Sequence, residues 1–384
     1  MKVAVLGYGT VGACVYSMLS DAPGMEAGPV LVRPGKAVES FMVSDAALIF
    51  GDPTVDAVVE TLGGLDPAYS YGMRALEAGK HFITANKAMV AAHGLELAAL
   101  AREKGAAFLF SAACGGGVPF LHNLALSAET DRIEAVSGIL NGTTNYMLDA
   151  MQRRSLSYGD ALREAQSLGY AESDPTADVS GLDALRKMQL ACAVAFGVLP
   201  QSGMLCEGME HFTAADVEDI QSRGLVCRLL ARGSRAGEGV SAYVEPVLFP
   251  RAAPESSVFT NNNMARYTGK RCGSIVLMGQ GAGRFPTASA VLRDLSAAQQ
   301  GARSMFPENC RAAEADNREA VHSYYIRTGG FAAVRLPLRS VLAQGEVVRA
   351  VTEPMSAEKM HALAQNIRKD GNDLFFAALE EELC

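Results

Sequence analysis

The chain has 384 residues, of which 34 are Lys or Arg and 42 are Asp or Glu, so its formal net charge is −8. This charge excludes a protein whose whole surface is built to neutralise nucleic-acid phosphates or anionic lipid. With 49% apolar and 20% charged residues, the chain can bury large cores. Its length suggests two or three domains of about 150 residues, and no apolar run is long enough to predict a membrane span.

The eight cysteines are scattered without CxxC spacing, in a chain too long to need disulfide staples. We expect reduced thiols and therefore a cytoplasmic protein. The six histidines show no HxH or HExxH spacing, so nothing in the sequence supports a zinc enzyme. Three glycines interrupt the apolar N-terminal stretch, which favours a strand and a turn over a signal peptide.

Residues 1 to about 125 alternate between short β-branched runs and longer helical patterns, as parallel βαβ units do. We predict an α/β protein whose first domain, residues 1–125, is an open, doubly wound parallel sheet. The expected strands are Lys2–Leu6, Val30–Arg33, Ala57–Thr61, His81–Ile83 and Ala107–Phe110, with helices at about Val11–Ser20, Tyr69–Ala78 and His93–Lys104.

The pattern changes beyond this point, and we expect an α+β substrate domain over residues 126–305, a polar linker near Pro307–Glu319, and a small αβ module over residues 320–384. The expected helices of these regions are Tyr158–Leu168, Ser180–Phe196, Ala214–Arg232 and Ala357–Lys369; the expected strands are Ile133–Ile139, Val240–Pro246, Ser274–Met278, His322–Ile326, Val347–Val351 and Leu374–Ala378.

A G-x-G-x-x-G motif, Gly7-Tyr8-Gly9-Thr10-Val11-Gly12, follows the first expected strand and opens a helix. In that context Gly7 permits the turn, Gly9 lets a pyrophosphate approach, and Gly12 lets the helix pack on the strand. The motif predicts a dinucleotide site, with a purely structural turn as the alternative.

After the second expected strand, where an NAD enzyme places a carboxylate, the chain has Arg33 and Lys36. Two cations suit a 2′-phosphate, so the sequence predicts that NADP(H) is preferred over NAD(H); the alternative is two solvated surface charges. The loop Leu62-Gly63-Gly64, after the third expected strand, is predicted to lie beside the same cofactor.

Two polar segments are candidates for the chemistry. Thr84-Ala85-Asn86-Lys87 follows a strand, where doubly wound sheets bind ligands. Asp183 and Lys187 share one helix face with the apolar residues that follow, and burial and neighbouring acids shift such a lysine's pKa in opposite directions. The alternative is an ion pair on the helix surface.

Four motifs together resemble those of homoserine dehydrogenase: TANKA (Thr84–Ala88), GILNGTTNYML (Gly138–Leu148), GYAESDPTADVSGLDALRK (Gly169–Lys187) and MGQGAGRFPTASAVLRDL (Met278–Leu295). The resemblance covers residues 1 to about 300. It implies a Rossmann-like first domain and NAD(P)-dependent interconversion of L-homoserine and L-aspartate 4-semialdehyde, on the route to threonine and methionine.

The resemblance also implies a role for individual residues. Lys187 matches the proton donor or acceptor, Lys87 a second lysine between nicotinamide and substrate, and Asp178 a further catalytic residue. Substrate contacts fall on Gly142, Thr143, Tyr170, Glu172 and Asp183, and cofactor contacts on Gly7, Gly9, Thr10, Val11, Gly12, Arg33, Lys36, Thr61, Gly63, Thr84, Lys87, Gly281, Gly283 and Thr287.

The segment Phe110–Pro119 matches a loop of the family that binds a monovalent cation, Na⁺ or K⁺, through a glutamate and backbone carbonyls. Ser111 stands at the glutamate position, so the only formal charge is lost and the cation is doubtful. By the same match, the remaining ligands would be the carbonyls of Cys114, Gly116 and Val118.

The tail resembles a degenerate ACT-like module, but Arg327-Thr328-Gly329-Gly330-Phe331 replaces the expected ligand-binding turn, so threonine regulation lacks support. A homodimer or higher homo-oligomer formed through the second domain is typical of the family. Two alternatives remain: a semialdehyde dehydrogenase with Cys114 as nucleophile, and a catalytically silent NADPH-binding regulator.

Overall fold

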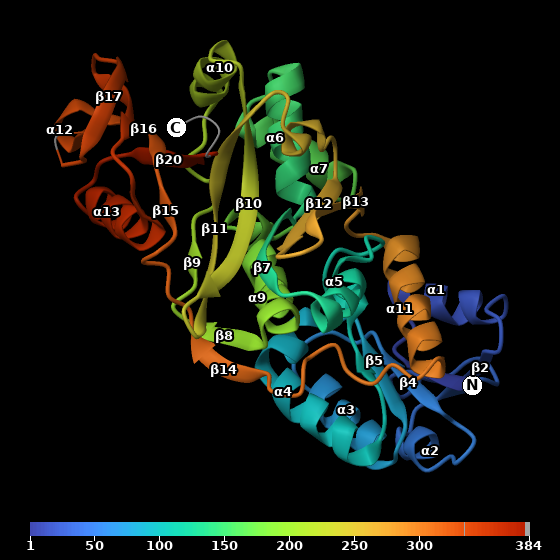
Figure 1. Cartoon of the computed structure of the whole chain (residues 1–384). Helices are drawn as coiled ribbons and strands as arrows, with labels where there is room; N and C mark the ends of the chain where they lie inside the picture. Colours follow the sequence, from blue (N-terminus) through green and yellow to red (C-terminus); the bar gives the residue numbers. More distant parts are fainter. Residues whose placement is uncertain (334, 381–384) are drawn as a thin grey trace. The chain divides into compact units, whose positions relative to one another are not determined.

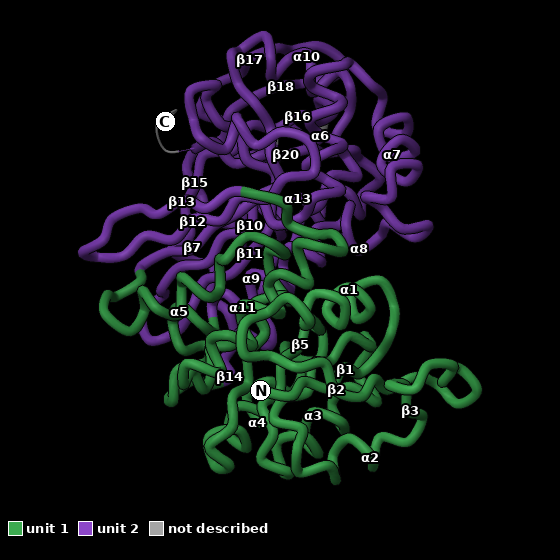
Figure 2. The backbone as a smooth tube through the Cα atoms, turned by 90° about the vertical axis from the view of Figure 1, so that its right-hand side faces the viewer, with its two compact units in different colours: residues 1–133, 193–199, 279–311 green, residues 134–192, 200–278, 312–384 purple. Residues whose placement is uncertain are grey.

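The computed structural model describes residues 1–333 and 335–380 and divides into two compact units (Figure 2). The first unit comprises residues 1–133, 193–199 and 279–311, and the second comprises residues 134–192, 200–278 and 312–384. The division into domains at 1–125, 126–305 and 320–384 stays a prediction. None of the described helices is long and apolar enough to cross a membrane.

The first unit is built on a six-stranded parallel sheet in the order β3-β2-β1-β4-β5-β6 (Figure 1). Its central strands are continuous apolar runs, and Val3, Val5 and Val59 are fully buried, as a sheet covered on both faces requires. The strand order reverses between β1 and β4, where doubly wound sheets bind ligands. The predicted α/β class with an N-terminal Rossmann-like sheet is confirmed.

The strands and helices predicted for residues 1–125 are present with shifted ends. Elements that were not predicted are the short strand Met42–Val43 and the helices Ala47–Phe50, Ser111–Ala113, Phe120–Thr130 and Arg284–Gln299. The helix expected at His93–Lys104 begins at Lys87, because the Asn86 side chain accepts a hydrogen bond from the Met89 amide and caps the helix. The elements are β1 Lys2–Leu6, α1 Thr10–Leu19, β2 Glu26–Leu31, β3 Met42–Val43, α2 Ala47–Phe50, β4 Ala57–Glu60, α3 Ala68–Glu77, β5 His81–Thr84, α4 Lys87–Lys104, β6 Phe108–Leu109, the 3₁₀ helix η1 Ser111–Ala113, α5 Phe120–Thr130 and α11 Arg284–Gln299.

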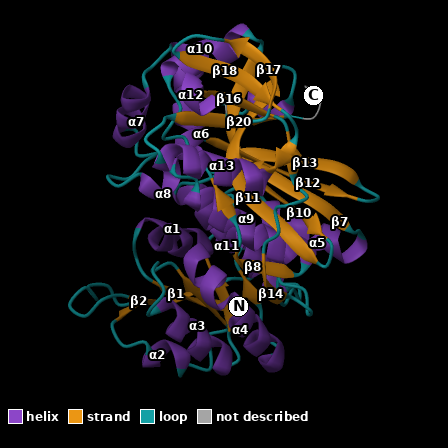
Figure 3. Cartoon of the chain, turned by 90° about the vertical axis from the view of Figure 1, so that its left-hand side faces the viewer, coloured by secondary structure: helices purple, strands orange, loops and turns teal. Residues whose placement is uncertain are grey.

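The second unit contains a large mixed sheet along which nine strands follow the order β13-β12-β7-β10-β11-β20-β16-β18-β17 (Figure 3). Its longest pair is the antiparallel hairpin of β10 and β11, paired from Leu225 with Pro250 to Ala236 with Gly239. The remaining elements of the chain are β7 Ile133–Ile139, α6 Gly142–Arg154, α7 Tyr158–Ser167, α8 Thr176–Val179, α9 Leu182–Phe196, β8 Val198–Ser202, β9 Leu205–Cys206, α10 Ala214–Ser222, β10 Leu225–Ala236, β11 Gly239–Pro250, the 3₁₀ helix η2 Pro254–Ser257, β12 Asn262–Gly269, β13 Gly273–Gln280, β14 Arg311–Glu314, β15 Val321–His322, β16 Tyr324–Gly329, α12 Gly330–Ala333, β17 Leu338–Ala343, β18 Val347–Thr352, β19 Met355–Ser356, α13 Ala357–Lys369 and β20 Leu374–Leu379.

Two expectations for this region are wrong. The helix predicted at Ala214–Arg232 ends at Ser222, because Gly224 takes a positive φ of 76° and the following apolar residues extend as β10. The segment predicted as a linker, Pro307–Glu319, contains strand β14, which pairs with β8. In both places strand pairing decides the local structure: β10 pairs with the adjacent β11 and the more distant β7, and β14 pairs with the distant β8.

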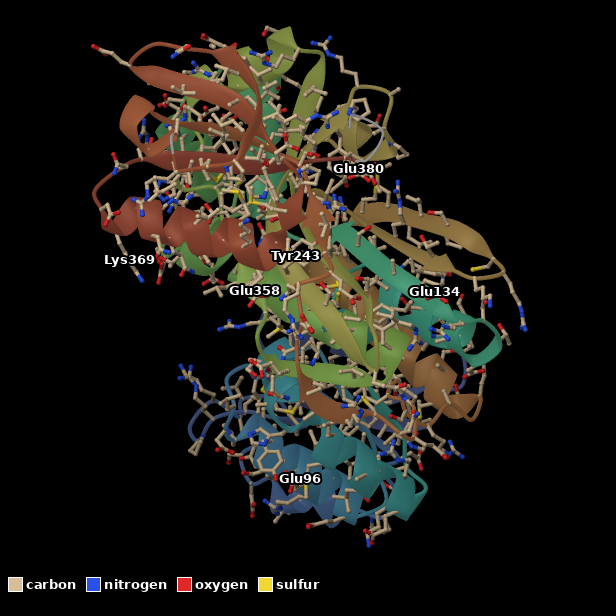
Figure 4. All side chains as sticks on the ribbon, turned by 60° about the vertical axis from the view of Figure 1, so that its left-hand side comes forward. Glu96, Glu134, Tyr243, Glu358, Lys369 and Glu380 are labelled. Carbon is tan, nitrogen blue, oxygen red and sulfur yellow. The ribbon has the colours of Figure 1, made fainter. Side chains whose placement is uncertain are left out.

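The expected elements of the tail are present, and they extend the large sheet. Strand β20 pairs in parallel with β11 and antiparallel with β16. Side-chain contacts reinforce this junction: Arg232 Nη2 lies 2.7 Å from Glu380 Oε2, and Tyr243 Oη lies 2.7 Å from His322 Nε2 (Figure 4). The tail therefore shares the sheet and the core of the second unit.

The segment that replaces the expected ligand turn of the tail is tied to α10. Arg327 is 7% exposed; it donates to Asp216 Oδ1 and to the His211 carbonyl, at 2.8 Å each, and pairs with Asp373. A buried guanidinium paired in this way stabilises the attachment of β16 to its neighbours, since removing either partner would leave an uncompensated charge.

Candidate active site

The turn after β1 has the geometry that its three glycines predict. Gly7 has a φ of 100°, a conformation that L side chains rarely adopt. A Cβ on Gly12 would lie 2.2 Å from the Gly7 carbonyl oxygen, so only glycine lets α1 pack this closely on the turn. A Cβ on Gly9 would meet nothing within 4 Å, so the backbone there is open to an approaching group.

A pocket of about 740 Å³ lies at the carboxyl ends of β1, β2 and β4. It is predominantly apolar, with a few cations and hydroxyls, as ligand pockets are. Six of the residues assigned to the cofactor from sequence line it, namely Gly7, Gly9, Arg33, Lys36, Thr61 and Gly63. Tyr8, Ser44, Pro67 and Tyr71 line it as well, whereas Thr10, Val11 and Gly12 lie in the first turn of α1 outside this lining.

A buried carboxylate, Glu60, shapes one wall of this pocket. Its Oε1 accepts hydrogen bonds from the Leu62 and Gly63 amides at 2.6 and 3.1 Å, and its Oε2 accepts one from the Thr84 hydroxyl at 2.5 Å. Thr84 in turn accepts from the Asn86 amide, so its fully buried side chain faces Glu60. Glu60 thereby fixes the loop of Leu62 and Gly63, and Lys87 follows as the first residue of α4.

The second unit brings together four of the residues predicted to act on substrate, namely Thr143, Asp178, Asp183 and Lys187. Lys187 Nζ lies 2.7 Å from Asp183 Oδ2 and donates to the Leu140 carbonyl at 2.6 Å. Lysine and aspartate are each 8% exposed, so this pair is buried, unlike the surface ion pair that was the alternative. A buried ammonium that loses its carboxylate partner is strongly destabilised, so the two groups depend on each other.

Asp178 reaches the same cluster from α8. The Asn141 amide donates to Asp178 Oδ1 at 2.7 Å, and the Thr143 hydroxyl, which donates to the Tyr170 carbonyl, lies 3.2 Å from Asp178 Oδ2. Burial is the largest influence on Asp178 and raises the pKa of its carboxyl, with Asp183 adding to the effect, while the bonds from Asn141 and Thr143 and the charge of Lys187 oppose it. A carboxyl in this environment can hold a proton above the usual aspartate range.

Gly142, Tyr170 and Glu172 lie at the edge of this cluster. A Cβ on Gly142 would lie 2.8 Å from the Asn261 carbonyl oxygen, so glycine is required where α6 begins. The Tyr170 ring packs against the Tyr146 ring, with centroids 5.1 Å apart. The Glu172 side chain is exposed. The Glu172 carbonyl accepts a hydrogen bond from the side chain of Gln166, on α7, at 3.2 Å.

The glycine loop with the predicted cation ligands packs against a second glycine loop in the first unit. The Gly117 amide donates to the Gln280 carbonyl at 3.0 Å, and a Cβ on Gly116 would lie 2.5 Å from the Gly281 carbonyl oxygen. Gly283 and Thr287 follow at the start of α11, where the Thr287 amide donates to the Gly283 carbonyl. None of Gly281, Gly283 and Thr287 is among the residues that line the pocket described above.

A buried acid lies beside this loop. The Ser111 amide donates to Asp294 Oδ2 at 2.8 Å, and Oδ1 of Asp294 has no hydrogen-bond partner among the described residues. Burial raises the pKa of Asp294 to about 7. Arg293 donates to the Gly117 carbonyl at 3.3 Å, which is not one of the three carbonyls predicted to hold a cation.

Sequence reasoning missed three residues of these clusters: Asn141, Glu60 and Ser44. Asn141 directly precedes a helix inside a motif that had been singled out, which is the usual signal of a capping residue. Glu60 is an acid at the end of an apolar strand, a pattern that predicts a paired buried carboxylate. Ser44 gave no signal, because its place in the pocket lining depends on the path of the chain through β3.

Comparison with known proteins identifies the family. The homoserine dehydrogenase model matches residues 119–296, and the model of the homoserine dehydrogenase NAD-binding domain matches residues 7–111. The chain belongs to the homoserine dehydrogenase family. Curated homoserine dehydrogenases from Corynebacterium glutamicum and Bacillus subtilis are 38% and 34% identical over 76% and 79% of this chain and 70% and 74% of their own.

Solved homoserine dehydrogenases share the fold over nearly the whole length. The Thiobacillus denitrificans structure has a TM-score of 0.87 at 29% identity and covers 99% of this chain and 98% of its own. The Staphylococcus aureus structure at pH 8.5 has a TM-score of 0.77 at 26% identity, with 99% of each chain covered. These matches include the tail.

The function is therefore that of a homoserine dehydrogenase, an oxidoreductase with an NAD-binding domain that interconverts L-homoserine and L-aspartate 4-semialdehyde. Both alternatives, a thioester-forming semialdehyde dehydrogenase and a silent NADPH-binding regulator, are set aside. The geometry agrees in one respect, since the Cys114 side chain is fully buried, an unfavourable environment for a thiolate nucleophile.

Proposed function

We propose that Lys187 exchanges the proton of this reaction at the substrate oxygen. In the direction of aldehyde reduction, negative charge develops on that oxygen, and the Lys187 ammonium stabilises the charge and then gives up a proton. In the direction of homoserine oxidation, the amine takes the hydroxyl proton back. The observation that supports this assignment is the buried contact of Lys187 Nζ with Asp183 Oδ2 at 2.7 Å.

We propose that one group of residues, Tyr170, Glu172, Asp178 and Asp183, holds the α-ammonium and the reacting oxygen of the amino acid, with Gly142 and Thr143 at its carboxylate end. The acids are suited to this because a charge-assisted bond to an ammonium is about twice as strong as a neutral one. Thr143 is already tied to both Tyr170 and Asp178, so these contacts are linked. Lys87 would hold the substrate oxygen against the nicotinamide.

We propose NADP(H) as the preferred cofactor, held by the pocket at Gly7, Gly9, Thr61 and Gly63. When bound, it supplies or accepts the hydride. Arg33, Lys36 and Ser44 all line the pocket, and two cations with a hydroxyl suit the three oxygens of a 2′-phosphate. Thr10, Val11, Gly12, Thr84, Gly281, Gly283 and Thr287 complete the assignment from the family motifs.

Four further assignments are proposed. No monovalent cation is required, because Ser111 stands in place of the carboxylate of the family's cation site. The tail is a degenerate ACT-like module without an effector, because Arg327 is buried in ion pairs where a ligand turn was expected. The chain forms a homodimer or a higher homo-oligomer, and it acts in the cytoplasm, as its scattered cysteines predict.

The deciding experiment is homoserine-dependent reduction of NADP⁺ and of NAD⁺ by the purified chain, followed as absorbance of the reduced nicotinamide. We expect reduction that needs homoserine and no phosphate, with a higher kcat/KM for NADP⁺. Formation of an acyl phosphate from the semialdehyde, phosphate and NADP⁺ would contradict the proposal, and so would cofactor binding without turnover.

A further inference from the structure

Asn141 is the second of the two residues between β7 and α6 and is 4% exposed. Its side-chain oxygen accepts hydrogen bonds from the Thr144 amide at 2.8 Å and the Thr144 hydroxyl at 3.0 Å, so it caps α6. Its amide nitrogen donates to Asp178 Oδ1 at 2.7 Å and to Asp183 Oδ2 at 2.9 Å. Since a primary amide has two N–H donors, both go to carboxylates.

This arrangement fixes the orientation of the amide. With nitrogen and oxygen exchanged, the oxygen would face two carboxylates and the nitrogen would face the Thr144 amide, so every one of these contacts would be repulsive. Among the twenty side chains, an amide of this length combines an acceptor for a helix N-terminus with two donors for separate acids. Capping alone would be satisfied by serine, threonine or aspartate.

The two carboxylates that Asn141 joins would otherwise repel each other. Asp183 raises the pKa of Asp178, and the Asn141 hydrogen bond lowers it. The charged groups that act on Asp178 are Asp183 and Lys187, both on α9, while its contacts from the β7 to α6 segment, Asn141 and Thr143, are uncharged. The amide thus offsets the repulsion without adding a charge.

The same short segment also fixes the lysine. Leu140 accepts from Lys187 Nζ through its carbonyl, and Asn141, the next residue, holds Asp183, the partner of Lys187. Asp183 Oδ2 accepts from both the Asn141 amide and the Lys187 ammonium. Two consecutive residues therefore set the positions of the amine and of both acids.

We propose that Asn141 is a positioning residue of the dehydrogenase reaction, whose amide holds Asp178 and Asp183 in the arrangement in which Lys187 exchanges its proton with the substrate. This inference rests on the roles proposed above for Lys187 and the two acids. Asn141 acts through these groups and need not touch the substrate.

The test compares Asn141→Ser with Asn141→Ala. Serine keeps a hydroxyl that can cap α6 but has no pair of donors that reaches both acids. We expect Asn141→Ser to lower kcat/KM for homoserine about 10- to 100-fold, the range of hydrogen bonds to charged groups. Because the lost bond lowers the pKa of Asp178, the acidic limb of the pH profile should move to higher pH. Asn141→Ala should show the same pH shift with an additional loss of thermal stability.

A matched control is Ser356→Ala, which removes the serine cap of α13 in the tail. It should lower the melting temperature as other lost caps do and leave the pH profile in place. The inference is overturned if Asn141→Ser keeps kcat/KM within about twofold of that of the unaltered chain and the acidic limb of its pH profile does not move. It is also overturned if the activity of all these variants changes only in proportion to their folded fraction.

Lys187→Ala separates this inference from the proposal on which it rests. Loss of turnover in Lys187→Ala together with an unaltered Asn141→Ser would refute the role of Asn141 alone. Full turnover in Lys187→Ala would refute the proposed proton route itself, whatever Asn141→Ser does.

Discussion

Replacing Asp294 by asparagine should make the stability of the chain less dependent on pH. The carboxyl is fully buried, and burial raises its pKa from the ordinary value of 3.8 to about 7. In the unfolded chain it ionises near its ordinary value, so between about pH 4 and pH 7 only the unfolded state releases the proton. Stability should therefore fall as pH rises through this window and then level off.

The size of this effect follows from the shift. A raise of about three pKa units corresponds to about 4 kcal/mol, which is an upper bound on the stability lost between pH 4 and pH 7 or above. Asparagine keeps an acceptor for the Ser111 amide but places an amide nitrogen where Oδ1 has no partner among the described residues. That mismatch lowers the unfolding free energy by about 1–3 kcal/mol at every pH. The change of unfolding free energy with pH is therefore diagnostic, whereas its value at one pH is not.

The assay is urea unfolding of both chains at intervals from pH 4.5 to pH 8, followed by circular dichroism. The difference in unfolding free energy should shift in favour of Asp294→Asn as pH rises. Asp316→Asn gives a control whose difference should stay constant over this range, because hydrogen bonds from Arg318 lower the pKa of Asp316 to about 2 and the carboxyl is ionised in both states above pH 4.5. For Asp294→Asn, a difference that does not vary with pH would refute the argument and show that Asp294 titrates normally.

Three further outcomes are expected. Lys187→Ala should lower kcat about 10²- to 10⁴-fold and abolish the limb of the pH profile of homoserine oxidation that requires a deprotonated base. An unchanged limb would show that Lys187 is only a structural ion-pair partner. Lys87→Ala should lower turnover and also raise KM. Arg33→Ala should weaken NADP⁺ and leave NAD⁺ nearly untouched, and equal losses would contradict a 2′-phosphate contact. The activity of the unaltered chain should not change with Na⁺ or K⁺, while Ser111→Glu should make activity depend on these ions. Strong activation of the unaltered chain by either ion would contradict this prediction.

Features that depend on neighbours in sequence were predictable. The conformation of the G-x-G-x-x-G turn is decided by steric contacts within six residues. As expected, the space around Gly9 is open, and Gly12 packs closely against the Gly7 carbonyl. Asp183 and Lys187 are one helical turn apart, so helix geometry alone places them together. The order of the longer strands and helices up to Lys104 follows in the same way from local hydrophobic patterning, whereas the short elements β3 and α2 were not predicted.

Features that depend on distant partners were not predictable. Nothing local shows that Asp294 accepts from Ser111, which lies 183 positions away in the chain. The residues after Ser222 have a pattern compatible with a helix, and pairing with the distant strand β7, as well as with the adjacent β11, makes them a strand. Asn141 could be recognised as a cap, but its contacts with two acids arise only once α8 and α9 pack on α6.

The parallel pairing of β20 with β11 affects how the second unit can unfold or be cut. Apolar side chains from the hairpin, such as Val247 and Phe249, share one buried cluster with tail residues such as Tyr324 and Phe376. Deleting the tail would expose this cluster together with the edge of β11, and such edges promote aggregation. Amide hydrogens of β11 and β20 should therefore exchange with solvent as one cooperative group, and the tail should not be transferable to another enzyme as an independent cassette.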